Sequence, residues 1–293
     1  MNIFETQPGF ITRDPRYSIS NDKKYTVGFT AEEQQARYEA WIAPEKLKGA
    51  SILDLGCCTG TVGGYALTHG AARYVGVEIS KSLAKIATEN FEEYHPGKNY
   101  EIVIESAEDY LSTATERFDF VIVSGILHGV TEITPFLSKV AQLGNTVVIE
   151  SVHPPLKVFN DLVNKLSTDA SEDLRKELFK MCYYVELLLP FAVYSDHGRM
   201  IMEDSQGAVT NILRPLISIG ALGMIFNRLG FERNPDVYGN LIRSLPAYFG
   251  YGKRFGISFT RSGDAKPMSF AELFESSEKE IAAWKDIDTK GTI

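Results

Sequence analysis

Between residues 51 and 150, two patterns of apolar positions alternate along the chain. Short apolar runs, which are typical of strands buried in a sheet, occur at 51–55, 74–79, 100–105, 118–123 and 146–150. Stretches with apolar residues at helical spacing lie between them, at 61–70, 81–95 and 133–143. The run at 118–123 is almost continuously apolar, as expected for a central strand that is covered on both faces. This alternation predicts a doubly wound α/β fold with a parallel sheet.

The sequence before residue 51 contains the pattern of one helix. Thr30 stands three residues before Glu33, which is the spacing of a capping box, and Tyr38 and Trp41 would form the apolar side of the helix. The residues before Thr30 are rich in turn formers. We therefore treat residues 1–48 as an N-terminal extension.

After residue 150 the alternation stops. We expect a mostly helical insertion, because the segment that follows is long, apolar and rich in aromatic residues. The pattern then resumes with a helix at 219–229 and two closing strands at 237–242 and 255–261. A polar tail with a short helix from Ser269 would end the chain. The predicted units are an N-terminal extension, a core, an insertion, the end of the core and a tail, at residues 1–48, 49–154, 155–215, 216–262 and 263–293.

Composition and net charge limit the kinds of partner and the cell compartment that we expect. The formal net charge of −8 argues against a broad phosphate-binding surface, so nucleic acid is a disfavoured partner. The three cysteines form no disulfide framework, and the first residues have no apolar signal-peptide core, which together favour a cytoplasmic protein. The longest apolar run, 187–193, is too short to span a membrane.

Small residues follow the first predicted strand, and a carboxylate follows the second. Gly56 and Gly60 would let the backbone approach a ligand closely. Glu78 could accept hydrogen bonds from both hydroxyls of a ribose. Because the carboxyl ends of parallel strands meet at one edge of the sheet, these residues predict a crevice that binds a nucleoside.

These residues resemble the first two motifs of the class I S-adenosylmethionine (SAM) dependent methyltransferases. The first motif of that family reads roughly Asp-x-Gly-x-Gly-x-Gly, and here it stands as Asp54, Gly56, Cys58 and Gly60, with Cys58 in place of the middle glycine. The G-x-G-x-x-G spacing that is typical of dinucleotide binding is missing, which favours SAM over NAD. The resemblance covers residues 49–150 well and 216–262 weakly. It implies a mostly parallel, seven-stranded sheet that ends in an antiparallel hairpin, with the insertion as a cap after the fifth strand.

The resemblance also implies roles in cofactor binding. Asp54 would contact the methionine amino end of SAM, Glu78 the ribose and Ile79 the adenine. The alternative for Glu78 is a solvent-facing acid at a strand end. Cys57 and Cys58 could be read as a redox or metal pair, but neighbouring side chains point apart, so we expect packing and no metal.

Two further segments resemble family motifs. Ser106 stands where the family often has an Asp that meets the adenine amino group, and the backbone of Ala107 or the carboxylate of Glu108 could serve instead. A helix start with acids in its first turn explains Glu108 equally well. Ser124 opens the segment 124–128, which looks like the fourth motif.

A general base is needed only if the methyl acceptor carries a proton at neutral pH. Three candidates follow predicted strands, namely His128 after the fourth, and Glu150 and His153 after the fifth. Each could instead be structural: His128 could hold its loop, and Glu150 and His153 could be a strand-end acid and a loop histidine. The polar cluster 196–199 in the insertion is a further candidate, with a solvated loop as its alternative.

From these observations we expect a cytoplasmic enzyme that uses SAM, releases S-adenosylhomocysteine (SAH), and methylates a small or medium organic acceptor. Oxygen is the first choice of acceptor atom, followed by nitrogen or carbon, and a homodimer is possible. Three alternatives stay open: an RNA or protein methyltransferase, a related transferase that moves an aminopropyl or carboxymethyl group, and a non-catalytic protein that binds SAM. In the family, an N-terminal segment often closes over the cofactor as a lid, and Tyr25 and Phe29 would suit that role.

Overall fold

The structure is a computed structural model. It describes residues 2–14, 29–130, 132–152, 186–191, 212–217, 219–234, 236–245, 249 and 254–263.

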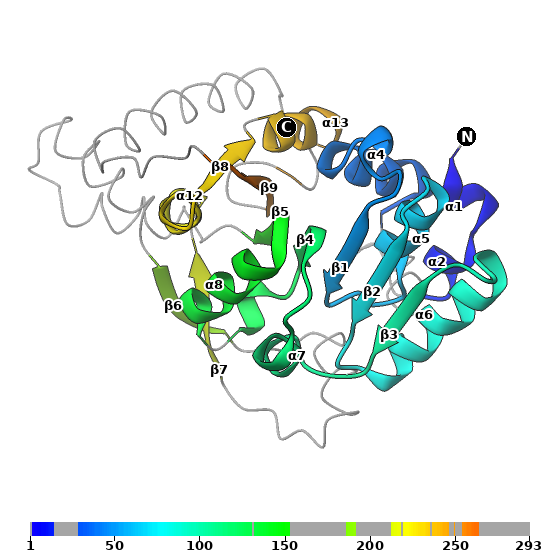
Figure 1. Cartoon of the computed structure of the whole chain (residues 1–293), viewed down its shortest axis with the longest axis horizontal. Helices are drawn as coiled ribbons and strands as arrows, with labels where there is room; N and C mark the ends of the chain where they lie inside the picture. Colours follow the sequence, from blue (N-terminus) through cyan, green and yellow to red (C-terminus); the bar gives the residue numbers. More distant parts are fainter. Residues whose placement is uncertain are drawn as a thin grey trace, which may run out of the picture.

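In the described part of the chain, a seven-stranded sheet forms the centre of the molecule (Figure 1). The strand order is β3-β2-β1-β4-β5-β9-β8. Their bounds are β1 Ser51–Leu55, β2 Arg73–Val77, β3 Tyr100–Val103, β4 Phe118–Ser124, β5 Gly144–Val152, β8 Phe231–Asn234 and β9 Arg254–Arg261. β1 to β5 pair in parallel, and β9 is antiparallel to both β5 and β8. The predicted fold class, a doubly wound and mostly parallel sheet, is confirmed.

The order of the strands places a switch point between β1 and β4. The chain runs outward from β1 through β2 to β3, and then crosses back to place β4 on the other side of β1. In open α/β sheets, ligands bind at such a point, outside the carboxyl ends of the strands. The fold therefore puts the predicted crevice where β1 and β4 end.

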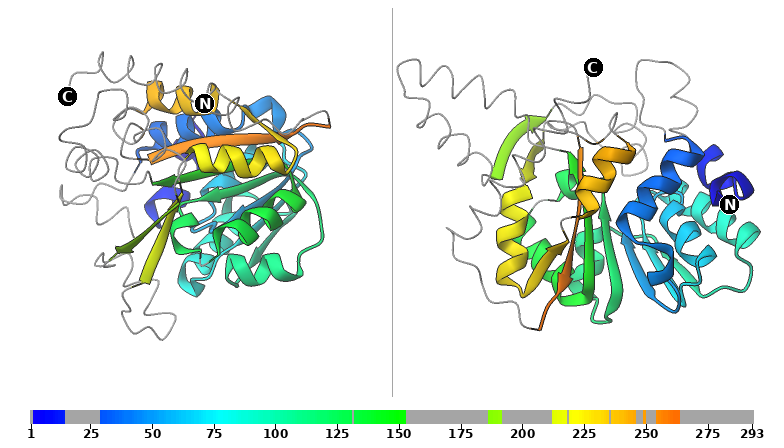
Figure 2. Two further views of the ribbon diagram at one scale, coloured as in Figure 1. Left: turned by 90° about the vertical axis from the view of Figure 1, so that its left-hand side faces the viewer. Right: turned by 90° about the horizontal axis from the view of Figure 1, so that it is seen from above.

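Helices cover the sheet in two groups (Figure 2). The first group packs along α4, α5 and α6 and includes α13, which contacts α4 and β9. The second group is α7, α8 and α12. The bounds are α4 Ala31–Trp41, α5 Thr61–Thr68, α6 Lys81–Tyr94, α7 Ala107–Thr113, α8 Ile133–Leu143, α12 Ile219–Arg228 and α13 Asp236–Ser244. The capping box of Thr30 and Glu33 at the start of α4 is present, as the sequence predicts.

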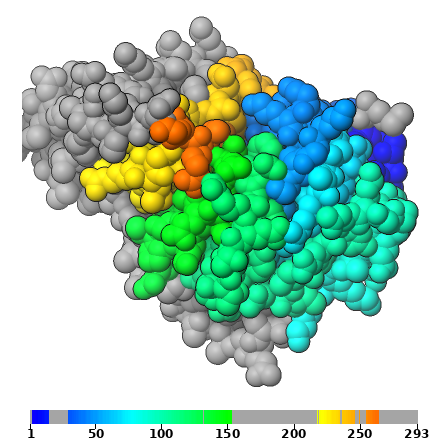
Figure 3. Space-filling model, in the orientation of Figure 1, coloured from blue at the N-terminus to red at the C-terminus, as the bar shows by residue number. Residues whose placement is uncertain are grey.

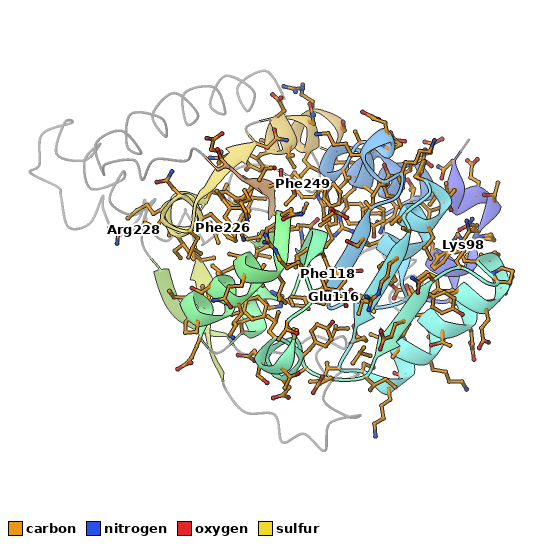
Figure 4. The ribbon with its side chains drawn as sticks, viewed as in Figure 1. Lys98, Glu116, Phe118, Phe226, Arg228 and Phe249 are labelled. Atoms are coloured by element: carbon orange, nitrogen blue, oxygen red, sulfur yellow. The ribbon has the colours of Figure 1, made fainter. Side chains whose placement is uncertain are left out.

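Apolar side chains from both helix groups bury the strands. Phe118, labelled in Figure 4, opens the predicted central strand and is 1% exposed. Phe226 on α12, also labelled there, stacks on Phe259 of β9 with ring centroids 4.4 Å apart. Val121, Ile122 and Val123 of β4 are consecutive and fully buried, so both faces of this strand are covered, which explains why its run is almost continuously apolar.

The N-terminal residues belong to this packing. Two short helices, α1 (Ile3–Thr6) and α2 (Gly9–Thr12), lie against α5 and α6, and Figure 3 shows this segment in blue beside the cyan core. Phe10 is fully buried against Gly64, where an added Cβ would come within 2.7 Å of its ring. The Oγ1 of Thr59 also donates to the carbonyl of Phe10 at 3.0 Å. Residues 2–14 are thus anchored to the core, while Tyr25 lies outside the described residues.

The predicted strand at 237–242 is wrong. These residues lie in α13, and β8 supplies the strand of the hairpin instead. Val237, Tyr238, Leu241 and Ile242 are buried. This spacing gives one apolar face to a helix, whereas in a strand it would place apolar side chains on both faces.

The described parts of the insertion are strands, which corrects the expected helical character there. β6 (Glu186–Phe191) and β7 (Ile212–Ile217) pair antiparallel in a separate two-stranded sheet. Pro190 and Pro215, which would break a helix, lie within these strands. The rest of the predicted insertion and the predicted tail helix lie outside the described residues. No helix in the described residues is long and apolar enough to cross a membrane.

Candidate functional site

The turn between β1 and α5 has an unusual backbone conformation. Gly56, Cys58 and Gly60 all have positive φ, of 80°, 53° and 82°. This left-handed region is strained for residues other than glycine, and Cys58 adopts it nonetheless. A Cβ on Gly56 would overlap Cγ2 of Ile126, so this glycine allows a close approach of two loops. The predicted glycine positions are therefore required by the turn itself.

Glu78 faces this turn from the end of β2. Its side chain is buried, at 6% exposed. Oε2 accepts from the backbone N–H of Cys58 at 2.9 Å, and Oε1 accepts from that of Ser80 at 2.9 Å. A carboxylate oxygen can accept more than one hydrogen bond, so this anchoring is compatible with contacts to two ribose hydroxyls. The structure brings the predicted ribose acid and the glycine turn together.

Asp54 is the second buried acid of the site. It is 1% exposed, and its Oδ2 accepts from the hydroxyl of Tyr74 at 2.8 Å. Burial raises the pKa of Asp54 to about 7, with a further increase from the charge of Glu78, while the Tyr74 hydrogen bond opposes the shift. This carboxyl group therefore changes its charge near neutral pH.

Two large apolar side chains stay exposed beside these acids. Ile79 follows β2 and is 51% exposed, and Ile104 follows β3 and is 53% exposed. β2 and β3 are parallel neighbours, so both side chains lie at the same edge of the sheet. Exposed isoleucines at this edge suit the flat apolar face of an adenine. Ile79 was a predicted site residue, whereas Ile104 was missed because a single apolar residue at a strand end carries no motif.

The third predicted segment begins α7. Ser106 is the N-cap, and its hydroxyl accepts from the N–H of Asp109 at 3.0 Å and donates to its Oδ2 at 2.6 Å. The Ser106 side chain is therefore committed to capping. Ala107 and Glu108 form the first turn of α7, where backbone N–H groups have no partner within the helix.

The fourth predicted segment is tied to a buried ion-pair cluster. Oγ of Ser124 accepts from Nη2 of Arg37 at 2.8 Å, and Nε of Arg37 donates to Oε2 of Glu150 at 2.7 Å. Arg254 binds the other oxygen, Oε1, through Nε at 3.0 Å and Nη2 at 2.7 Å. Glu150 is fully buried; burial opposes its ionisation, but the two guanidiniums hold the pKa of its carboxyl below its usual value. With both oxygens engaged and a low pKa, this arrangement favours the structural alternative for Glu150.

Sequence reasoning missed Arg37, which organises this cluster. Its guanidinium carbon lies 4.4 Å from the ring centroid of Trp41, 4.8 Å from that of Phe29 and 5.4 Å from that of Tyr38. The available signal was an arginine of the predicted helix that stands directly before Tyr38 and one helical turn before Trp41.

Of the remaining candidates for the general base, only His128 lies among the described residues. His128 lies in the short 3-10 helix η2 (Leu127–Gly129), which follows β4 and packs against β7. It therefore lies at the same sheet edge as Ser124. His153 and the cluster at 196–199 lie outside the described residues.

Comparisons with known proteins find methyltransferases. Residues 52–144 match the model of a methyltransferase domain family. A curated relative from Saccharolobus solfataricus, named probable cobalt-precorrin-6B C(15)-methyltransferase (decarboxylating), is 27% identical over 107 residues. This match covers 36% of the chain and 54% of the relative, so the chain spans about half the length of that protein.

One solved structure shows a similar fold. A protein from Listeria monocytogenes, assigned to the S-adenosylmethionine dependent methyltransferases, is 16% identical with a TM-score of 0.50, and the match covers 80% of this chain and 100% of that one. The magnesium protoporphyrin IX methyltransferase of Synechocystis PCC 6803, crystallised with SAH, is 13% identical with a TM-score of 0.48, and the match covers 89% and 100% of the two chains.

Proposed function

We propose that this chain, whose residues 52–144 match a methyltransferase domain family, is a class I, Rossmann-like methyltransferase that transfers a methyl group from SAM to a small or medium organic acceptor. One observation carries the proposal. Glu78 is held by two backbone N–H groups at the carboxyl edge of β2, facing a glycine turn that follows β1. Such a carboxylate beside such a turn suits a nucleoside with an amino-acid tail.

The residues of the crevice form three groups, one for each part of SAM: the ribose, the adenine and the methionine tail. Glu78 binds the ribose, and Ile79 with Ile104 contacts the adenine. Asp54 and the turn from Gly56 to Gly60, including Cys58, hold the methionine tail. Ser106, Ala107 and Glu108 remain candidates for contacts to the adenine edge: the Glu108 carboxylate can accept from the adenine amino group, and a backbone N–H in the first turn of α7 can donate to a ring nitrogen.

Bound SAM supplies a methyl group on a sulfonium, which is already an activated leaving group. The protein must then align the acceptor with the methyl group and exclude water. His128, which follows the carboxyl end of β4, is the described residue we propose to take a proton from the acceptor where one is present. We propose that Glu150 positions Arg37, and through it Ser124, rather than taking a proton itself. His153 stays a candidate from the sequence.

The net charge of −8 supports a small acceptor over a nucleic acid, because a polyanion would be repelled by most of the surface. Oxygen remains the first choice of acceptor atom. A screen of metabolite mixtures with methyl-labelled SAM would identify the acceptor. Binding of SAM without label transfer to any acceptor would support the non-catalytic alternative.

Calorimetric titration with SAH tests the proposed cofactor site. Glu78→Ala should weaken SAH binding by about 1.5–3 kcal/mol for each charged hydrogen bond that is lost. Glu101→Ala, which removes an exposed acid of the neighbouring strand β3, is the matched control and should bind SAH as the wild type does.

Two results would count against the proposal. Unchanged affinity in Glu78→Ala would remove Glu78 from the site. A wild-type protein that binds neither SAM nor SAH would exclude the cofactor itself. Thermal unfolding of each variant without ligand shows whether a loss of binding reflects a loss of the fold.

A further inference from the structure

The cluster around Glu150 holds more positive than negative charge. One fully buried carboxylate is bound by two guanidiniums, from Arg37 on α4 and Arg254 on β9. The three formal charges leave one positive charge in excess. Arg37 also interacts electrostatically with the buried Asp54, so the positive charge that can still take a further negative partner is that of Arg254.

The two arginines differ in their access to solvent. The side chain of Arg37 is 11% exposed and is enclosed by the rings of Phe29, Tyr38 and Trp41. The side chain of Arg254 is 28% exposed. The excess charge therefore reaches solvent mainly through Arg254.

Arg254 is also oriented by its carboxylate partner. Its Nε and Nη2 both donate to the single oxygen Oε1 of Glu150, so Nη1 takes no part in this pairing. A guanidinium that is fixed in this way presents a planar set of donors, which matches the geometry of a carboxylate or a phosphate.

The position of Arg254 in the sheet places it beyond the proposed cofactor site. The strands run in the order β1-β4-β5-β9, and neighbouring strands are about 4.8 Å apart, so the start of β9 lies roughly 14 Å from the end of β1. Asp54 and the proposed methionine tail are at β1. Arg254 is instead close to the turn after β4, where a Cβ added to Gly125 would lie 3.6 Å from its Nη2. Gly125, with φ of 71°, leaves this approach open.

We propose that Arg254 binds an oxyanion of the methyl acceptor, a carboxylate or a phosphate, and that Glu150 holds the guanidinium in position for it. This inference rests on the proposed function and names the substrate class of the same site. It makes Arg254 a specificity-determining residue, with Glu150 and Arg37 as its positioning residues.

The test uses the full chain saturated with SAH and three probes of similar shape: benzoate, benzamide and phenyl phosphate. Binding is followed by nuclear magnetic resonance of the arginine Nε–H signals, and Arg254→Lys identifies the signal of Arg254. Benzoate or phenyl phosphate should shift that signal and bind at least about tenfold more tightly than neutral benzamide. The stronger of the two anions then tells a carboxylate acceptor from a phosphorylated one.

Variants separate the explanations. Arg254→Gln should lose the preference for the anions, Arg254→Lys should keep part of it because the charge remains, and both should bind SAH as the wild type does. Arg243→Gln, which changes an exposed arginine on α13, should behave as the wild type.

Three results would overturn the inference. The first is equal binding of anions and benzamide, or no binding of either anion. The second is an anion preference that survives in Arg254→Gln. The third is a loss of SAH affinity in Arg254→Gln while its fold is intact, which would assign Arg254 to the carboxylate of the cofactor. Failure of the wild type to bind SAH would instead refute the proposed function, and it is measured first in the same samples.

Discussion

At the scale of single residues, the ionisation of Asp54 connects stability to cofactor binding. Its pKa is raised from 3.8 to about 7, chiefly by burial. Because the folded value lies above the unfolded one, the stability that this group contributes is fully present below pH 3.8 and is lost as the pH rises through 7. In the free protein, burial thus favours the protonated carboxyl group of Asp54. A bound ammonium group of the ligand favours the ionised carboxylate instead.

We therefore predict that SAH affinity rises with pH through about 7, because the carboxylate of Asp54 must form to receive the ammonium group. Calorimetry across this range would show the increase, together with proton release on binding below the pKa. Asp54→Asn removes the titrating group, so its affinity should be lower and nearly independent of pH. Parallel profiles for the two proteins would contradict the role of Asp54.

Gly56 allows a second residue-scale prediction, because a matched glycine exists. Gly56 and Gly49 have similar φ values of 80° and 76°, but only Gly56 would place a Cβ against a neighbour, Ile126. Gly49→Ala should cost about 1–2 kcal/mol of unfolding free energy from backbone strain alone. Gly56→Ala should cost about 1–3 kcal/mol more, because crowding adds to the strain. Urea unfolding measures both, and equal costs would show that the loops can separate.

At the scale of elements, the local pattern of apolar residues predicted most strands of the sheet. The strand β8 and the helix α13 depend on contacts between distant parts of the chain and were not predicted. β1, β2, β4 and β5 were predicted because buried parallel strands are largely continuous apolar runs. β3 lies at the sheet edge and is only partly buried, and its place in the alternation of strands and helices predicted it. β8 was missed because it lies at the sheet edge and reads Phe-Glu-Arg-Asn, in which only Phe231 is buried. α13 was taken for a strand because its apolar residues form two short pairs, whose helical spacing is visible only across the whole segment.

Some residues of the candidate site could likewise be predicted from the sequence, and others could not. The glycine turn and Glu78 could be predicted because the motif is local and the turn requires its glycines. The cluster of Arg37, Glu150 and Arg254 could not, because Arg37 and Glu150 are 113 residues apart and Glu150 and Arg254 are 104 apart. Only the sheet order brings the three together.

His95, at the end of α6, contacts the N-terminal helices. It is 4% exposed, packs against Phe10 and Phe91, and has Nε2 3.1 Å from Oε1 of Gln7. Burial lowers its pKa from 6.5 to about 4, and the charge of Lys98 adds to this shift. The stability that the neutral ring contributes is therefore present above pH 6.5 and is lost as the pH falls toward 4.

We predict that the unfolding free energy of the wild type falls more steeply between pH 6.5 and 4 than that of His95→Gln, because only the wild type must protonate a buried ring. Urea unfolding at several pH values measures both slopes. Comparing the two proteins cancels the opposite contribution of Asp54. Equal slopes would mean that His95 titrates as it does in the unfolded chain.

At the scale of the whole molecule, charge is distributed unevenly. The chain carries a net charge of −8, while the cluster of Arg37, Glu150 and Arg254 has two positive charges and one negative charge. An acidic surface repels long polyanions, and a partly buried arginine such as Arg254 can still attract a small anion. The two features together favour a small anionic acceptor over RNA.

A crystal structure of the protein with SAH would show whether SAM binds where β1 and β2 end. We expect both ribose hydroxyls on Glu78, the adenine against Ile79 and Ile104, and the amino-acid tail along the turn from Gly56 to Gly60. SAH bound elsewhere, or bound there with Glu78 turned away from the ribose, would contradict this expectation.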